Sequence, residues 1–234
     1  MDQVSHFQLP LALFLAAILN LDRQSVGQSM LARPLAAGLL VGLASGHSRE
    51  GLYLGLWTEL LWLSQPPLGG FLTPNGGLAV SAALLAWSAA SQFWTVPPDK
   101  GALVLIFLFI PPAAVLATGL EKMARSVSGR VEARLEESLS QGRRPFFMWS
   151  NLKGLLFTLA AGAASLAVFA ALLALILSAS LRLAPDFLWP LLSRAAPFIP
   201  LAGLALNAGR MDRKLAGPYI LGLLAGAGYL ALRP

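Results

Sequence analysis

Residues 21–79 alternate short apolar runs with polar, glycine-rich and proline-rich stretches, and this pattern constrains the fold more than any other part of the chain. The interruptions read LDRQSVGQSMLARP, GHSREG, TELLWLSQPP and GGFLTPNGGLA. The apolar runs at 34–46 and 51–63 hold about 13 residues each, whereas a helix needs about 20 to cross a bilayer. Irregular backbone survives at membrane depth only inside protein or around a cavity. The pattern therefore predicts broken or re-entrant helices around a solute site, which favours transport.

The composition places the whole chain in a membrane. Of its 234 residues, 56% are hydrophobic and 12% are charged, whereas soluble domains carry about 25% charged residues. We predict an all-α, polytopic integral membrane protein that forms one domain over residues 1–234. Its parts are a broken-helix substrate region at 22–79, a cytoplasmic amphipathic loop at 121–153 and C-terminal membrane helices at 154–232.

Several segments have the length and apolar character of membrane helices. The expected membrane helices cover residues 77–94, 101–120, 154–181 and 215–232. Pro111 and Pro112 remove two backbone donors from the second of these, so we expect a kink, hinge or break there. A further apolar segment at 185–206 should be broken by its three prolines, Pro190, Pro197 and Pro200.

The charged residues indicate topology rather than nucleic-acid binding. The net charge is +6, and residues 121–153 carry seven basic and four acidic side chains between apolar segments. An excess of Lys and Arg marks cytoplasmic loops, whereas a nucleic-acid interface needs a continuous basic stripe with aromatic platforms. Within this loop Met123, Val127, Val131 and Leu135 recur every four residues, which predicts an amphipathic helix at the membrane surface or against a partner.

Several kinds of chemistry are excluded by missing residues. The chain has no cysteine and two histidines, so disulfides, thiolate chemistry and a histidine metal cluster are not expected. It also lacks a phosphate-binding Walker loop, an HExxH motif, a serine elbow and a dinucleotide fingerprint. We therefore predict no catalytic residues, no metal and no cofactor, and expect that the chain alone is not an enzyme.

Glu59 is the carboxylate that lies inside an apolar run, in LGLWTELLWLS. A charge at that depth costs at least about 2.5 to 3.5 kcal/mol unless it is paired or solvated. One interpretation is that Glu59 faces a cavity and accepts hydrogen bonds from sugar hydroxyls. The other is that it is neutral, or paired with a helix end or an arginine.

Four further residues are candidate substrate ligands: Asn75, Gln28, Gln65 and Thr73. Asn75 lies in a glycine-rich loop where an amide can both donate to and accept from hydroxyls, but Pro-Asn-Gly-Gly is a strong turn signal, so an ordinary surface turn is the preferred interpretation. Asp22 and Arg23 either line the cavity or lie at the membrane interface, which is the preferred interpretation for Arg23.

Aromatic residues and glycines near these ligands are also open to two interpretations. Trp57 and Trp62 are either a platform for a sugar face or interfacial residues. Gly38, Gly42, Gly46, Gly51 and Gly55 recur at a spacing that favours close contact between neighbouring helices.

These residues together resemble the IIC membrane subunit of the mannose/fructose/sorbose family of phosphotransferase-system sugar permeases. The resemblance is carried by LDRQSVGQSMLARPLAAGLLVGLASG, GLYLGLWTELLWL and the PxGGFLTPNGGLA loop, in the order and spacing that the family uses. It is strongest over the first third of the chain. Glu59 matches the family's Leu-Glu position, whereas Asn75 stands where the family usually has aspartate.

The resemblance implies an elevator-type sugar permease subunit in the bacterial plasma (inner) membrane. Its implied partners are a IID membrane subunit, IIA and IIB phosphocarrier subunits, the lipid bilayer and a hexose-type sugar presented to IIB for phosphorylation, with a homo-oligomer of IIC–IID units left open. Phosphoryl-transfer chemistry would belong to the partner subunits, and IIB would dock on the loop at 121–153. Two other functions remain: a secondary carrier or channel without phosphoryl coupling, and a non-transporting membrane scaffold or sensor.

Overall fold

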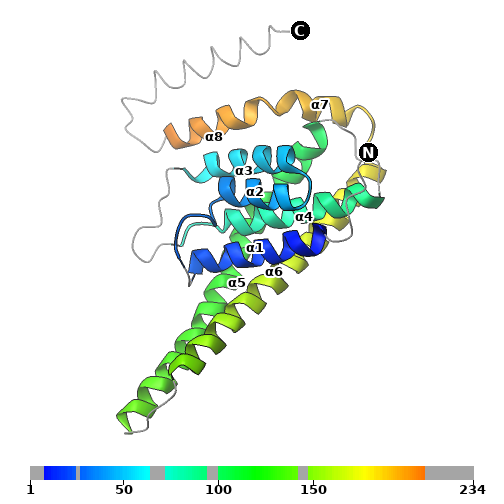
Figure 1. Ribbon diagram of the computed structural model, residues 1–234. Helices are drawn as coiled ribbons and strands as arrows, with labels where there is room; N and C mark the ends of the chain where they lie inside the picture. The colour runs from blue at the N-terminus through cyan, green and yellow to red at the C-terminus, as the bar shows by residue number, and fades with distance from the viewer. Residues whose placement is uncertain (1–7, 25–26, 64–71, 94–99, 142–146, 209–234) are drawn as a thin grey trace.

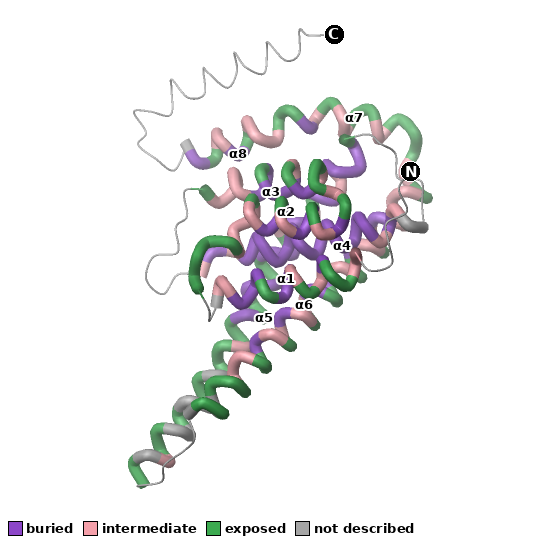
Figure 2. The backbone as a smooth tube through the Cα atoms, in the orientation of Figure 1, coloured by how far each residue is buried: buried purple, intermediate pink, exposed green. Residues whose placement is uncertain are grey.

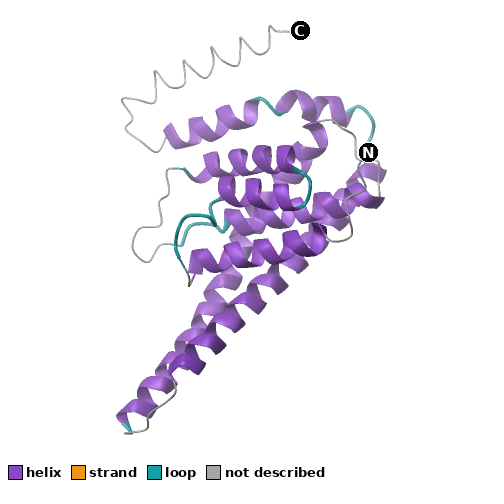
Figure 3. Ribbon diagram, viewed as in Figure 1, coloured by secondary structure: helices purple, strands orange, loops and turns teal. Residues whose placement is uncertain are grey.

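The computed structural model describes residues 8–24, 27–63, 72–93, 100–141 and 147–208, and in these residues it is helical without strands (Figures 1 and 3). Eight helices follow one another along the described chain. They are α1 (Gln8–Gln24), α2 (Pro34–Ala44), α3 (Ser48–Trp62), α4 (Gly76–Phe93), α5 (Lys100–Ser140), α6 (Phe147–Leu183), α7 (Leu188–Ala195) and α8 (Phe198–Ala208). The expected all-α fold is confirmed.

Helix α4 forms the centre of the molecule. It packs against α1, α2, α3, α5 and α6, and every residue from Gly76 to Ser88 is buried (Figure 2). Its sequence, GGLAVSAALLAWSAASQF, is rich in glycine, alanine and serine, which allow neighbouring helices to approach on all sides. The loop that leads into α4 is therefore held at the middle of the helix assembly.

Helices α2 and α3 form a short antiparallel hairpin with nearly touching backbones. A Cβ atom added to Gly38 would lie 2.5 Å from the carbonyl oxygen of Gly51, and one added to Gly51 would lie 2.2 Å from that of Gly38. Gly42 and Gly55 face backbone atoms of the opposite helix in the same way. The close contact predicted from the glycine spacing is confirmed, and both helices are too short to span a bilayer alone.

Helices α5 and α6 form a long hairpin that projects from the body (Figure 1). Their segments Lys100–Val127 and Asn151–Leu183 are long and apolar enough to cross a membrane, as expected for the helices at 101–120 and 154–181. Much of the region predicted as a polar loop continues these helices, because α5 ends only at Ser140. We call the far part of this hairpin, residues 128–150, the distal arm.

The proline-rich segments behave in two different ways. The predicted break at Pro111 and Pro112 is wrong, because α5 continues through both residues. Two prolines remove only two intrahelical hydrogen bonds, and α3, α4 and α7 pack against this helix. The break predicted within 185–206 is confirmed, since α7 and α8 meet at 46°. The last expected membrane helix, at 215–232, lies outside the described residues.

Candidate functional site

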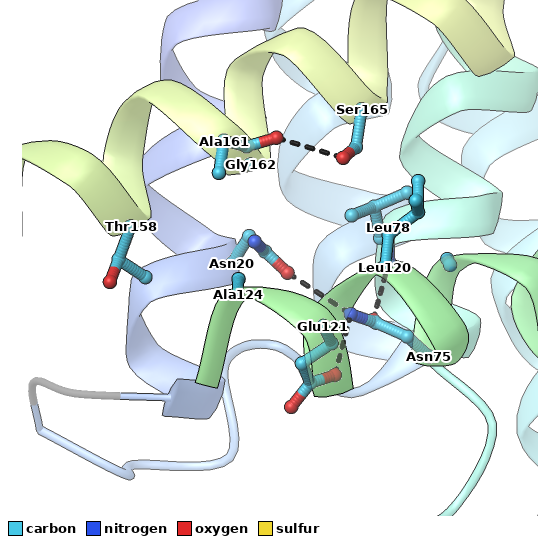
Figure 4. A pocket seen from close by; sticks show the side chains of 11 residues that line it. Asn20, Asn75, Leu78, Leu120, Glu121, Ala124, Thr158, Ala161, Gly162 and Ser165 are labelled. Carbon is cyan, nitrogen blue, oxygen red and sulfur yellow. Dashed lines mark hydrogen bonds between the residues drawn. The ribbon is translucent and has the colours of Figure 1, made fainter. Parts of the chain in front are cut away.

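A buried polar cluster lies where α1, the loop before α4, and α5 meet (Figure 4). We call it the Asn75 cluster, and its members are Asn20 and Arg23 from α1, Thr73 and Asn75 from the loop, and Thr118, Glu121 and Arg125 from α5. Thr73 takes part through its backbone carbonyl oxygen and the others through side chains; the segments are about 50 to 100 residues apart in sequence, so only the folded chain brings these groups together.

Asn75 is the centre of this cluster and is only 1% exposed. Its Oδ1 accepts a hydrogen bond from the Leu78 amide at 3.1 Å, which caps the first turn of α4. Its backbone amide donates to Thr118 Oγ1 at 2.8 Å, and its Nδ2 donates to Asn20 Oδ1 at 3.1 Å and Glu121 Oε2 at 3.3 Å. The interpretation of this loop as an ordinary surface turn is therefore wrong.

The bond to Glu121 also gives a physical reason for an amide at position 75. Asn75 Nδ2 faces two acceptor oxygens, which only a donor can satisfy. An aspartate in the same place would put a second carboxylate about 3 Å from Glu121 in a buried site, where two negative charges repel strongly. Asparagine at 75 and glutamate at 121 therefore form a matched pair.

Glu121 carries the negative charge of the cluster, and its side chain is 1% exposed. Arg23 Nε donates to its Oε2 at 3.0 Å, and Arg125 Nη2 donates to its Oε1 at 2.8 Å. Arg23 also donates to the carbonyl oxygen of Thr73. The interfacial interpretation of Arg23 is thus corrected: its guanidinium ties the end of α1 to α5 and to the loop before α4.

Sequence reasoning placed Glu121 at the start of a polar loop and missed its part in the cluster. A signal was present, because Thr118, Glu121 and Arg125 follow one another at three- and four-residue intervals on one face of a helix. It was hidden by the assumption that the membrane helix ended at residue 120. Asn20 was missed because a single amide near the end of an apolar segment is typical of a membrane interface.

A small pocket adjoins the cluster between α1, α4, α5 and α6 (Figure 4). Asn20, Asn75 and Glu121 form its polar side, and Thr158, Gly162 and Ser165 of α6 lie opposite. The space at its centre is about 20 Å³, which admits a water molecule but not a hexose.

Glu59 lies outside this pocket, on α3. Its Oε1 pairs with Arg33 Nε at 3.1 Å, and its Oε2 accepts a hydrogen bond from the Leu35 amide at 3.3 Å in the first turn of α2. The interpretation of Glu59 as paired with an arginine and a helix end is confirmed. These contacts fix the start of α2 against α3, because Glu59 is on α3, Arg33 directly precedes α2 and Leu35 lies in its first turn.

The remaining predicted ligands do not converge on one point. Thr73 is buried in the Asn75 cluster, whereas Gln28 is exposed in the loop before α2, with a left-handed φ of 48°. Gln65 lies outside the described residues. Trp57 is buried against Tyr53 and Phe107, so it is a core residue rather than a sugar platform or an interfacial anchor.

Asp22 holds the loop between α1 and α2. Its Oδ1 accepts hydrogen bonds from the amide and hydroxyl of Ser29 at 2.8 and 2.7 Å, and its Oδ2 accepts one from the Ala32 amide at 3.3 Å. The same loop contains two non-glycine residues with positive φ, Gln28 and Met30. Left-handed backbone is unfavourable for residues other than glycine. The hydrogen bonds of the Asp22 carboxylate to Ser29 and Ala32 therefore stabilise the strained backbone of Gln28 and Met30.

The described residues are helical and include two apolar helices of membrane length around a buried polar cluster, which places the protein in the class of multi-pass helical membrane proteins. Its particular family follows from comparison with known proteins. Residues 6–232 match the family described as the sorbose-specific IIC component of the phosphotransferase system, and the chain belongs to this family. The resemblance drawn from the residues is confirmed.

Individual relatives agree with this family. The chain is 30% identical over 115 residues to the Escherichia coli (strain K12) protein named "Putative N-acetylgalactosamine permease IIC component 2", an alignment that covers 49% of this chain and 80% of that protein. Two solved structures share the fold. One, titled "Structure of membrane protein", has a TM-score of 0.66 at 19% identity and covers 96% of this chain and 88% of its own. The other, the mannose transporter ManYZ with microcin E492, has a TM-score of 0.57 at 20% identity and covers 96% and 87%.

Proposed function

We propose that this chain is the sugar-translocating IIC subunit of a mannose-family phosphotransferase system, which binds a hexose-type sugar and presents it to a IIB subunit. Its membrane partner in this proposal is a IID subunit, its soluble partners are IIA and IIB, and its location is the bacterial inner membrane. The observation that carries the proposal is the Asn75 cluster, a set of amides and a carboxylate buried between apolar helices next to a pocket.

The chemistry of this cluster suits a polyol. Sugar hydroxyls both donate and accept hydrogen bonds, and amides with a carboxylate supply both complements. Burying these groups is unfavourable, by several kcal/mol for each ion, so their presence in an apolar helix assembly favours a functional role. The described side chains around the pocket include no cysteine or histidine nucleophile, which fits binding and translocation with phosphoryl transfer on partner subunits.

The glycine-rich hairpin of α2 and α3 supports a moving part. Its two helices pack backbone to backbone and are joined by the Glu59–Arg33 pair, so they can shift as one body. The pocket beside Asn75 lies between α1, α4, α5 and α6 and is too small for a hexose as it stands, so admission of a sugar requires helix movement, which the hairpin can drive through its packing on α1 and α4. Alternating exposure of a site between a mobile unit and a scaffold is the general scheme of membrane transporters.

The experiment that tests this function is sugar uptake in cells that express the chain with its IID partner. A panel of radiolabelled hexoses and amino sugars is compared with IIB present and absent, in wild type and in Glu59→Ala. We expect accumulation of sugar phosphate that depends on IIB. Because Glu59 pairs with Arg33, Arg33→Ala is the matched control: equal losses in both variants assign Glu59 to packing, and a larger loss in Glu59→Ala assigns it to substrate binding.

Other outcomes of the same experiment favour the two alternatives. Uptake that is indifferent to IIB and driven by a proton gradient supports a secondary carrier with Glu59 as its proton or cation site. Absence of both uptake and sugar binding, with membrane insertion verified, supports a scaffold or sensor.

The distal arm is the proposed docking surface for IIB. Its described part lies beyond the membrane-length segments of α5 and α6 and is largely exposed (Figure 2). Replacing residues 128–150 with a short Gly-Ser linker preserves Glu121 and Arg125 of the Asn75 cluster. We expect IIB-dependent sugar phosphorylation to fall at least about tenfold while co-purification with IID persists, because only the soluble contact is removed. Unaltered phosphorylation contradicts this assignment.

A further inference from the structure

Glu121 is a buried carboxylate at the boundary between an apolar helix and a pocket. It lies within the membrane-length segment Lys100–Val127 and is 4% exposed as a residue. Glu59, the carboxylate that the sequence singled out, is instead engaged at the start of α2 and does not line this pocket. Of these two carboxylates, Glu121 is therefore the one placed to meet a ligand there.

The hydrogen bonds of Glu121 divide its two oxygens into a fixed one and an exchangeable one. Oε2 is held by Arg23, which is 19% exposed, and by the buried amide of Asn75. Oε1 accepts from Arg125, whose side chain is 45% exposed and lies one helical turn further along α5. Because the Arg125 guanidinium already reaches solvent, a ligand hydroxyl can replace it on Oε1 and keep that buried oxygen hydrogen-bonded without burying the released cation.

The number of hydrogen bonds that the Glu121 carboxylate can accept also leaves room for a ligand hydroxyl. An ionised carboxylate offers about four lone-pair positions, and the described residues fill three of those on Glu121. Asn20 adds a donor to the same pocket: its Nδ2 lies in the notch that Gly162 leaves in α6, and a Cβ at 162 would lie 2.6 Å from that nitrogen. The pocket wall thus presents a carboxylate acceptor and an amide donor together.

We propose that Glu121, with Asn20 beside it, binds a hydroxyl group of the transported sugar and so contributes to its selection. This inference rests on the proposed sugar-transport function and deepens it by assigning the binding carboxylate to α5. Arg23 and Asn75 hold Oε2, while Oε1 exchanges Arg125 for the sugar. The hydroxyls of a pyranose ring can donate to the Glu121 carboxylate and accept from the Asn20 amide, because both groups line the same pocket.

The test is sugar binding to the purified IIC–IID complex, combined with deoxy analogues. Affinities are measured first for glucose, mannose, galactose and their amino and N-acetyl derivatives, and then for each monodeoxy analogue of the sugar that binds. We expect one deoxy position to weaken binding by about ten- to a hundredfold in wild type. In Glu121→Gln the parent sugar should weaken, and that deoxy analogue should bind as well as the parent.

Matched variants separate binding from packing. Asp186→Asn changes an exposed carboxylate that does not line the pocket, so it should keep the wild-type preference for the parent sugar over its deoxy analogue. Glu121→Asp retains the charge but shortens the side chain, so it should fold and lose most of the discrimination. If Glu121→Gln still prefers the parent sugar over the deoxy analogue as strongly as wild type does, the inference is overturned. If the glutamine variant does not fold, the same result in Glu121→Asp overturns it. Absence of sugar binding to wild type overturns the proposed function instead.

Discussion

Gly51→Ala should destabilise the protein strongly, because it forces apart the two helices that pack most closely. A methyl group at residue 51 would lie 2.2 Å from the carbonyl oxygen of Gly38 and 3.0 Å from the Cα of Gly42. Both contacts are with backbone, so no flexible side chain can move aside. Overpacking typically costs about 1 to 3 kcal/mol, and a backbone clash on this scale lies at the upper end or beyond.

The measurement for Gly51→Ala is thermal unfolding of the purified protein in detergent, together with its level in the membrane. Gly119→Ala is the matched control, since it is also a helical glycine-to-alanine change but has no atom within 4 Å of the added Cβ. The control should be neutral or more stable by up to about 1 kcal/mol, because alanine favours the helix. Equal behaviour of the two variants would show that close contact of α2 with α3 contributes nothing to stability.

The glycine contact could be predicted because it depends on a local periodic pattern. Small residues at four-residue spacing make a flat helix face, and the next helix along the chain is the nearest partner. Two other local features were also sufficient: the length of the apolar runs predicted two short helices in 34–63, and the prolines of 185–206 predicted the break between α7 and α8. The break expected at Pro111 and Pro112 is absent because packing against neighbouring helices, which a local rule omits, keeps α5 continuous.

The Asn75 cluster could be predicted only in part. Asn75 and Thr73 were candidates from loop composition, but burial of the loop comes from α1 and α5, which lie far away in sequence. In the sequence, Arg23 and Glu121 each look like a charged residue at the membrane interface. Only the fold places Arg23 Nε 3.0 Å from Glu121 Oε2. Long-range pairing of this kind has no signature in one sequence, because each partner alone is compatible with several environments.

The end of α1 connects the cluster to the α2–α3 hairpin. Arg23 binds Glu121 and the carbonyl oxygen of Thr73, and the preceding residue, Asp22, binds Ser29 and Ala32 in the loop that leads into α2. Two adjacent side chains therefore hold the polar cluster on one side and the hairpin entrance on the other. A shift of the hairpin relative to the pocket has to strain or release one of these anchors.

Asp22→Ala should release the loop and lower transport at least about tenfold. The substitution removes three hydrogen bonds, and charge-assisted bonds are stronger than neutral ones. The left-handed backbone of Gln28 and Met30 then loses the contacts that stabilise it. Hydrogen exchange at the amides of Ser29 and Ala32 measures the release directly, and uptake measures its functional effect.

Ser29→Ala makes this prediction sharper because it removes only the hydroxyl bond to Asp22 and leaves the amide bond in place. Its effect on hydrogen exchange and uptake should be smaller than that of Asp22→Ala. Since both substitutions act on one shared carboxylate, the double variant should be no worse than Asp22→Ala alone. Additive losses would mean that Asp22 and Ser29 act independently, and an unchanged loop in Asp22→Ala would mean that other contacts fix the entrance to α2.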